Sequence, residues 1–302
     1  MALDEPTAQG VRFLLALVDD ELAGHSVCER LRINPAGMGG LVPSDPRVRR
    51  LLVRAPGSML LWMLQGDDPE VNARLYGVNR LPLGLRRDIL TGVSFADPAP
   101  AARVTVGRLA DASNALNASN EEYQQALTDL APDGIIAQLY EAGGRAGGSF
   151  RRARTAAGRI RSEQWPAVLR AHQDSPFPGY ARWALSQRID CPAELRARFG
   201  ESPRYRHRLR EAGIFDGPAE YVQAAAPAAE VLRLLGIGRW AYPGRLAQAG
   251  AVLRPLVHAD LGTHLEAWAV LAQLLPDFVG TLPELIRTAG AIAGPAPQST
   301  AR

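Results

Sequence analysis

The sequence predicts an all-α fold, an α-solenoid built from short antiparallel helix pairs. Helix-favouring Ala, Leu and Arg dominate the composition, whereas β-branched residues are sparse. An Asp-Pro-x-Val sequence also recurs 23 residues apart, at Asp45–Val48 and at Asp68–Val71. Apolar residues at helical spacing follow each occurrence, and then come a break, at Ala55-Pro56-Gly57 in the earlier copy, and a second apolar stretch. Each unit therefore predicts two short helices that bury their apolar sides on neighbouring units.

Residues 1–140 are predicted to form an N-terminal helical-repeat region that opens with a capping helix. Apolar residues at positions 11, 14, 15 and 18 recur at helical spacing and give this first helix one buried side. A weaker copy of the repeat unit follows, in which Val27 and Leu31 precede a break at Asn34-Pro35.

The clearest copy of the unit begins at Asp68, whose carboxylate can accept hydrogen bonds from the free backbone N–H groups of a first helical turn. Pro69 suits the first helical position, because that position needs no N–H donor. Val71 and Leu75 then supply a buried stripe, and Pro82 starts the second helix of the unit. The inward-facing residues of that second helix are Leu85, Ile89 and Leu90.

A glycine- and arginine-rich joint over residues 141–163 is predicted to divide the chain. Before it, a linker at residues 94–100 leads to two helices between Ala101 and Tyr140. After it, residues 164–293 are expected to form a C-terminal helical region, followed by a disordered tail over residues 294–302.

The C-terminal helical region begins with a degenerate copy of the unit, because the sequence from Asp190 to Leu195 is similar to that from Asp67 to Val71. Helix formers and apolar spacing then continue towards the tail. Four further helices are predicted at residues 219–235, 242–257, 261–275 and 282–292.

The repeat length of just over twenty residues, with two short helices in each unit, resembles the leucine-rich repeat variant. The paired helices are also similar to those of HEAT-like repeats. The resemblance is best over residues 45–92, extends to residues 25–45 and 165–200, and covers about a third of the chain. It implies stacked helix pairs. The cysteine cluster that some variant-repeat proteins carry for an iron–sulfur centre is missing, so the resemblance implies a fold and not an activity.

The chain contains no lysine, so all 34 of its basic residues are arginine. This absence excludes Schiff-base catalysis, a pyridoxal phosphate anchor and the lysines of P-loop and kinase nucleotide sites. The sequence also lacks a Gly-x-Ser-x-Gly elbow, and its glycine runs lack the pattern of a nucleotide site. We therefore expect a non-catalytic protein without a cofactor.

One group of residues, His258, Asp260, His264 and Glu266, combines several metal-ligand types. On a helix the side chains of His258 and Asp260 point about 200° apart, at 100° per residue, so they cannot share one ion unless the helix breaks, and Gly262 could provide that break. Capping and solvated polar roles account better for this group, and we expect no metal site.

The two cysteines, Cys28 and Cys191, are too widely spaced for a disulfide framework or a zinc site and fit a reducing cytoplasm. The acidic first ten residues and the interrupted apolar stretch after them do not fit a signal peptide. No uncharged stretch is long enough to cross a bilayer. We expect a cytoplasmic protein that does not associate with membranes.

Charge is distributed unevenly along the chain. Between Arg145 and Arg210 there are 15 arginines and five acidic residues, a net charge of +10, so the remainder sums to −7. Folding needs no such segregation, and arginines interleaved with aromatic residues suit a phosphate backbone or unstacked bases. The candidate partner-binding residues are Arg151, Arg152, Arg154, Arg159, Arg161, Trp183, Arg204, Arg206 and Arg208.

Two interpretations of this charge need no partner: a solvated face whose arginine stems cover apolar surface, or packing of the basic segment against the acidic N-terminal part. The preferred functional hypothesis is a scaffold that presents an extended surface to a protein partner. The alternative is nucleic-acid binding. Some HEAT-like repeat proteins are DNA glycosylases with a basic groove lined by tryptophans and an aspartate, and Trp165, Trp183 and Asp190 are similar in kind.

Overall fold

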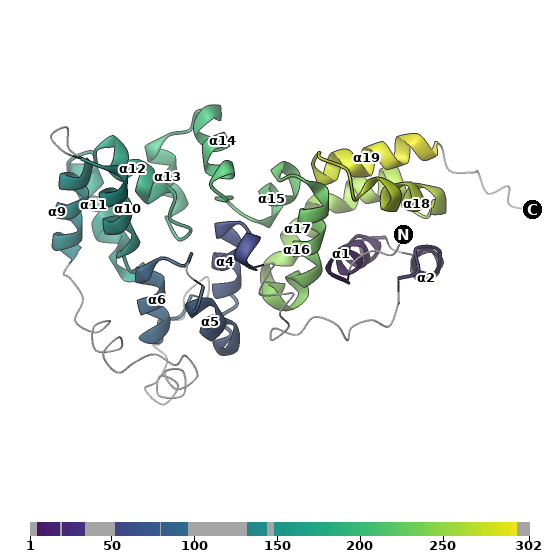
Figure 1. Ribbon diagram of the computed structural model, residues 1–302, viewed down its shortest axis with the longest axis horizontal. Coiled ribbons are helices and arrows are strands. Elements are labelled where there is room, and N and C mark those ends of the chain that lie inside the picture. Colours follow the sequence, from purple (N-terminus) through teal and green to yellow (C-terminus); the bar gives the residue numbers. More distant parts are fainter. Residues whose placement is uncertain are drawn as a thin grey trace, which may run out of the picture. The chain divides into compact units, whose positions relative to one another are not determined.

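The computed structural model describes residues 5–18, 20–33, 52–78, 80–95, 132–143 and 148–294, and these contain helices and no strand (Figure 1). The prediction of an all-α fold is confirmed. The chain forms two compact units, the first from Met1–Ala55 and Phe215–Arg302 and the second from Pro56–Ile214. Within the described ranges, no helix has both the length and the apolar character needed to cross a membrane.

The second unit begins with α4 (Gly57–Leu64), α5 (Pro69–Tyr76) and α6 (Leu83–Leu90). The predicted start of α5 is confirmed: Asp68 Oδ1 accepts hydrogen bonds from the backbone N–H groups of Glu70 and Val71, at 2.8 and 3.0 Å. Val71 and Leu75 are buried as predicted, and Pro82 precedes α6. The inward-facing residues predicted for α6, which are Leu85, Ile89 and Leu90, are also buried.

The earlier copy of the unit is described only in part. Its Asp45–Val48 start lies outside the described residues, as does the Asn34-Pro35 break before it. Its second helix is α4, which begins directly after Pro56 as the predicted break requires. Seven of the eight residues of α4 are buried.

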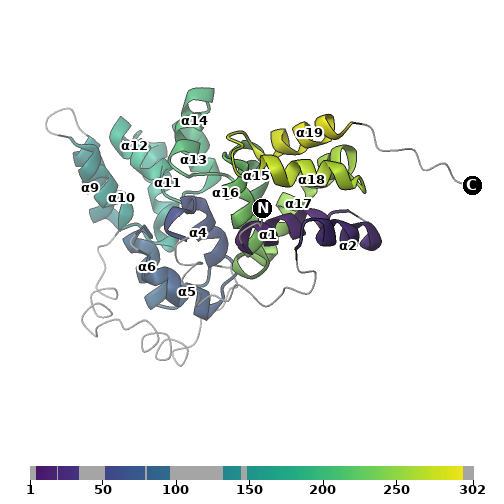
Figure 2. The same cartoon turned by 45° about the vertical axis from the view of Figure 1, so that its right-hand side comes forward.

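The second unit continues with α9 (Pro132–Gly143), α10 (Phe150–Gly158), a 3-10 turn η1 (Ser162–Gln164), α11 (Trp165–Asp174), α12 (Gly179–Ser186), α13 (Ala193–Phe199) and α14 (Pro203–Glu211). Helix α10 packs against both α9 and α12 (Figures 1 and 2). Its side chains Ala153, Ala156 and Ala157 enter a core shared with Leu139 and Leu185.

The boundaries predicted at residues 140 and 163 both lie inside the second unit, which runs from Pro56 to Ile214. Helix α10 forms residues 150–158 of the segment predicted as a joint, whereas residues 144–147 lie outside the described ranges. The linker at 94–100 and the helices predicted before residue 132 lie largely outside them as well.

Helices α12 and α13 share some local features with α4 and α5, although the N-cap of α13 is Pro192 and that of α5 is Asp68. Both α4 and α12 have eight residues and a proline at the N-cap. The helix after each carries a Glu–Arg ion pair four residues apart, Glu70–Arg74 in α5 and Glu194–Arg198 in α13. The same order of cap, helix and ion pair therefore occurs twice in the second unit.

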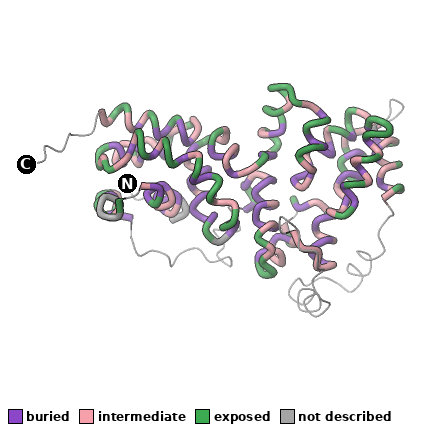
Figure 3. Tube along the Cα trace, turned by 180° about the vertical axis from the view of Figure 1, so that it is seen from behind, coloured by how far each residue is buried: buried purple, intermediate pink, exposed green. Residues whose placement is uncertain are grey.

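The first unit comprises α1 (Glu5–Leu15), α2 (Glu21–Arg30), α15 (Pro218–Ala224), α16 (Ala228–Ala241), α17 (Pro243–Leu256), a π-helical turn η2 (Val257–Leu261), α18 (Leu265–Leu274) and α19 (Leu282–Ala293). Helix α1 crosses α16 closely, because a Cβ added to Gly10 would lie 2.1 Å from the carbonyl oxygen of Leu232. Helices α18 and α19 lie side by side (Figure 2). Figure 3 shows buried and exposed positions alternating along the helices.

The prediction of one helix over residues 219–235 is wrong. The structure has two helices there, α15 and α16, because Pro227 lacks an N–H group and cannot continue a helix from the residues before it. The predicted helix from residue 261 begins instead at Leu265, after Gly262 adopts a positive φ of 46°. Residues 295–302, predicted as a tail, lie outside the described ranges.

Candidate functional site

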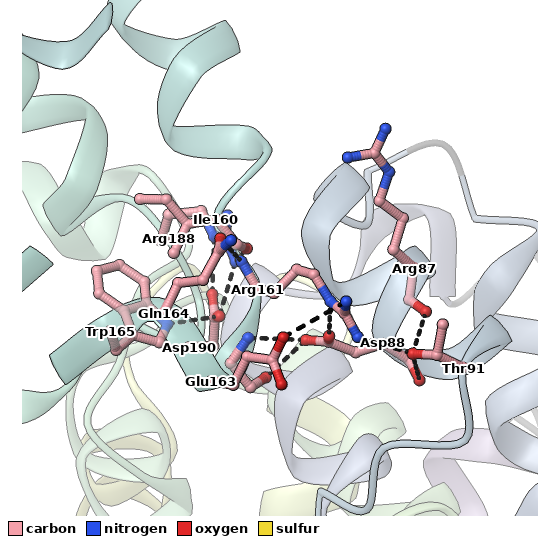
Figure 4. A network of polar contacts seen from close by, with 11 residues as sticks. Arg87, Asp88, Thr91, Ile160, Arg161, Glu163, Gln164, Trp165, Arg188 and Asp190 are labelled. Atoms are coloured by element: carbon pink, nitrogen blue, oxygen red, sulfur yellow. Dashed lines mark hydrogen bonds and ion pairs between the residues drawn. The ribbon is translucent and has the colours of Figure 1, made fainter. Parts of the chain in front are cut away.

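A buried acid–arginine contact ties α6 to the segment between α10 and α11 (Figure 4). The carboxylate of Asp88 is fully buried and accepts hydrogen bonds from Arg161 Nε and from the N–H and hydroxyl groups of Ser162, each at 2.8 Å. Arg161 Nη2 also donates to Thr91 Oγ1 at 2.9 Å. Two segments more than 70 residues apart in sequence are thereby held together.

The electrostatics of this contact are those of an internal pair. Burial raises the pKa of the Asp88 carboxyl, and the guanidinium of Arg161 and the donors of Ser162 act in the opposite direction. The side chain of Arg161 is only 12% exposed and has a second acidic neighbour, Glu163, at 3.5 Å. Arg161, one of the predicted partner-binding residues, is thus engaged inside the second unit.

A second buried contact lies next to the first. Asp190 accepts hydrogen bonds from Arg188 Nε at 2.8 Å, from Arg188 Nη2 at 2.7 Å and from Trp165 Nε1 at 2.9 Å. Arg188 also donates to the carbonyl oxygens of Ala157 and Ile160, at the C-terminal end of α10. A guanidinium at this end of a helix is favourable, because the free carbonyl groups there carry partial negative charge.

This contact involves two of the three residues on which the similarity to the DNA glycosylases is based. Trp165 and Asp190 bind each other in the interior, where the side chain of Asp190 is 8% exposed. Arg188 occupies both oxygens of that carboxylate and lies over the Trp165 ring, 5.6 Å from its centroid. These two residues therefore stabilise the unit instead of lining a groove.

Two other buried titratable groups of the second unit, His172 and Cys191, are also enclosed by the protein interior. His172 Nδ1 accepts a hydrogen bond from the backbone N–H of Phe177 at 3.0 Å, and its ring lies against those of Phe177 and Phe199. Burial lowers the pKa of His172, and Arg182 also contributes to this effect. Burial raises the pKa of Cys191 to about 12. Among the residues that the structure describes, no three His, Cys, Asp or Glu side chains are arranged to hold a metal ion.

Helix α10 separates alanine from arginine on its two sides. Ala153, Ala156 and Ala157 are buried, whereas the side chains of Arg151, Arg152 and Arg154 are exposed. The helix contains no acidic residue. A fourth predicted binding residue, Arg159, is half-buried, and its Nη1 donates to Gln138 Oε1 at 3.3 Å.

Helix α14 exposes three more of the predicted residues, Arg204, Arg206 and Arg208. The guanidinium of Arg208 lies 5.9 Å from the centroid of the Trp183 ring on α12, and Tyr205 meets the same ring edge-on at 5.7 Å. The structure therefore brings Trp183 and Arg208 together, although 25 residues separate them.

Eight arginines of the second unit are exposed and have no ion pair with any other described residue: Arg151, Arg152, Arg154, Arg170, Arg182, Arg204, Arg206 and Arg208. Arg170 and Arg182 are not among the residues predicted from the sequence, because each is a single arginine in an apolar stretch. Their positions on the polar sides of α11 and α12 could have indicated that they are exposed.

No protein-family model, curated protein or solved structure matches this chain. The exposed arginines are therefore the feature from which function is inferred.

Proposed function

We propose that this chain is a non-catalytic helical-repeat scaffold that binds an acidic protein partner through the arginine face of α10. We define this face as Arg151, Arg152 and Arg154. One observation carries the proposal: three exposed guanidinium groups lie on a single helix without an acidic partner among the described residues, while the opposite side of that helix is buried.

Electrostatics supports a partner for this face. Arg151 and Arg152 lie in the first turn of α10, where the free N–H groups already carry partial positive charge, so both placements oppose helix stability. Arg151 and Arg154 are one turn apart and repel each other. The buried alanines on the opposite side of α10 already pack in the core of the second unit. An acidic surface on a partner would offset this repulsion and direct the encounter.

The architecture supports a scaffold. The shared features of helices α4–α5 and α12–α13 favour an α-solenoid for the second unit, of the kind found in the leucine-rich repeat variant and HEAT-like repeats. Solenoids present extended surfaces without special chemistry. The engagement of Asp88, Asp190 and His172 in internal contacts supports a non-catalytic role, because these groups are occupied away from solvent.

The test is a capture experiment from the native host with wild type and an Arg151→Gln/Arg152→Gln/Arg154→Gln variant, followed by binding measurements on the purified partner that is identified. Glutamine keeps the length and polarity of the side chain and removes its charge. The matched control removes the same charge from three exposed arginines of the first unit, in an Arg32→Gln/Arg54→Gln/Arg287→Gln variant.

We expect the α10 variant to lose the partner, the control to retain it, and wild-type binding to weaken as salt rises. Circular dichroism should show unchanged helix content in both variants, because all six side chains are exposed. Equal retention by wild type and the α10 variant would refute the proposal. So would equal loss in both variants, because that outcome reports net charge and not a surface.

A further inference from the structure

A second surface of the second unit combines aromatic rings with arginines. Tyr180 and Trp183 lie one turn apart on α12, and Arg204 and Arg208 lie one turn apart on α14, so each pair shares one side of its helix. The contact between Arg208 and the Trp183 ring joins the two pairs. We call these four residues the α12–α14 surface.

The aromatic residues of this surface are not used by the core. Tyr180 is 51% exposed, although a tyrosine ring is one of the largest apolar groups in the chain. Trp183 is only partly buried. Within the described part of the chain, neither the Tyr180 hydroxyl nor the Trp183 indole N–H has a hydrogen-bond partner. Both side chains therefore offer a ring face or edge together with a free polar group.

The charges around this surface are mostly positive. Helix α14 carries four arginines and one acid, Glu211, and that acid lies 3.4 Å from His207 one turn before it. Helix α12 adds the exposed Arg182. The nearest acid in sequence on the other side, Glu201, precedes α14 and has no ion pair with another described residue. An anionic ligand is favoured here.

We propose that the α12–α14 surface binds single-stranded nucleic acid. Bases would stack on the exposed ring of Tyr180 and on the guanidinium of Arg208, which already lies on Trp183, while Arg204 contacts the phosphate backbone. Every base has a π face, so such stacking needs no particular sequence. This is a further activity, on helices other than the one that carries the proposed protein-binding face.

The aromatic residues favour single-stranded nucleic acid over an acidic peptide or a duplex. An acidic peptide would gain from the arginines but would leave Tyr180 without a role, because carboxylates do not stack. A duplex would also gain from the arginines, but its bases are paired and stacked on each other and cannot reach the ring. An unpaired strand is the ligand that uses the rings and the charges together.

The experiment measures fluorescence anisotropy of labelled 15-nucleotide oligo(dT) and oligo(U) with the full chain at two salt concentrations. The variants are Tyr180→Ala, Tyr180→Phe and Arg204→Gln/Arg208→Gln. The matched control, Arg170→Gln/Arg206→Gln, removes the same charge from α11 and from the side of α14 that points about 200° away from Arg204.

We expect binding by wild type and a loss of about tenfold in affinity for Tyr180→Ala, because stacking on an aromatic residue contributes about that much per base. Tyr180→Phe should retain binding. Arg204→Gln/Arg208→Gln should also weaken binding and lower the slope of log affinity against log salt by about 0.7, the contribution of the single phosphate contact that Arg204 makes on an unpaired strand. The control should change both quantities less.

Three results would overturn the proposal: no binding at about 50 mM salt, unchanged affinity in Tyr180→Ala, or an equal loss in the control. Competition by poly-glutamate that matches the oligonucleotide, together with an unchanged Tyr180→Ala variant, would assign the surface to acidic protein instead. Failure here leaves the proposed protein-binding face untouched, because that face is tested with the α10 variant.

Discussion

Replacing Asp88 by asparagine should destabilise the second unit strongly while keeping the shape of the side chain. The substitution removes the charge that neutralises Arg161 and places an amide NH2 among three hydrogen-bond donors. Breaking a buried ion pair from one side costs about 3 to 5 kcal/mol. Arg161 is 12% exposed and retains Glu163 at 3.5 Å, so we expect a smaller loss in the free energy of unfolding, about 2 to 4 kcal/mol.

The assay is urea unfolding combined with hydrogen exchange at the backbone N–H of Ser162, which donates directly to Asp88. The Asp88→Asn variant should unfold at lower urea and exchange this amide faster. The matched control is Glu163→Gln, which removes the exposed acid from the same arginine and should cost less than about 1 kcal/mol.

A double variant tests whether the loss of stability comes from leaving the charge of Arg161 unpaired or from the changed side chain at position 88. Asp88→Asn/Arg161→Met removes both charges and keeps an amide oxygen that can accept from Ser162, so it should be more stable than Asp88→Asn alone. The reasoning is refuted if Asp88→Asn and Glu163→Gln lose equal stability. That result would mean that Arg161 is fully satisfied without the buried carboxylate.

Two further predictions concern packing and pH. Gly84→Ala should destabilise the second unit by several kcal/mol in urea unfolding, because the new Cβ would lie 1.8 Å from the carbonyl oxygen of Ile160. In the control Gly158→Ala the new Cβ meets nothing within 4 Å, so this variant should be neutral or slightly stabilising. Equal losses of stability in the two variants would contradict the close contact at Gly84. The pKa of His172 is lowered in the folded state, so the folded protein favours the neutral imidazole. The contribution of His172 to the free energy of unfolding is therefore fully present above the ordinary histidine pKa near 6.5 and is lost as the pH falls. Wild type should therefore lose stability below about pH 6.5 more steeply than His172→Asn, whose amide oxygen can still accept from Phe177, and parallel pH profiles would contradict this role.

The helix starts could be predicted because their causes are local. The cap at Asp68, the proline after it and the buried side formed by Val71 and Leu75 all lie within eight residues of sequence. The break at Pro227 was equally local and was missed because the alanines around it favour a helix so strongly. A proline after three alanines should have outweighed the composition.

The internal acid–arginine contacts could not be predicted in the same way. Arg161 and Asp88 are 73 residues apart, and an arginine in a basic stretch does not reveal whether its partner is inside or outside the protein. One signal was present: Asp88 follows Leu85 by three residues and so lies on the apolar side of its helix, where a charge needs a buried partner. The meeting of Trp183 and Arg208 likewise depends on how α12 and α14 pack.

The arginines in and around α10 perform two opposite tasks. Arg151, Arg152 and Arg154 extend into water, whereas Arg161 and Arg188 are enclosed near its C-terminal end by carboxylates and carbonyl oxygens. A dicarbonyl reagent such as phenylglyoxal, which modifies accessible guanidines, should therefore label the first three rapidly and the last two only when the second unit unfolds. In a chain without lysine, this one reaction can distinguish loss of a contact surface from loss of the fold.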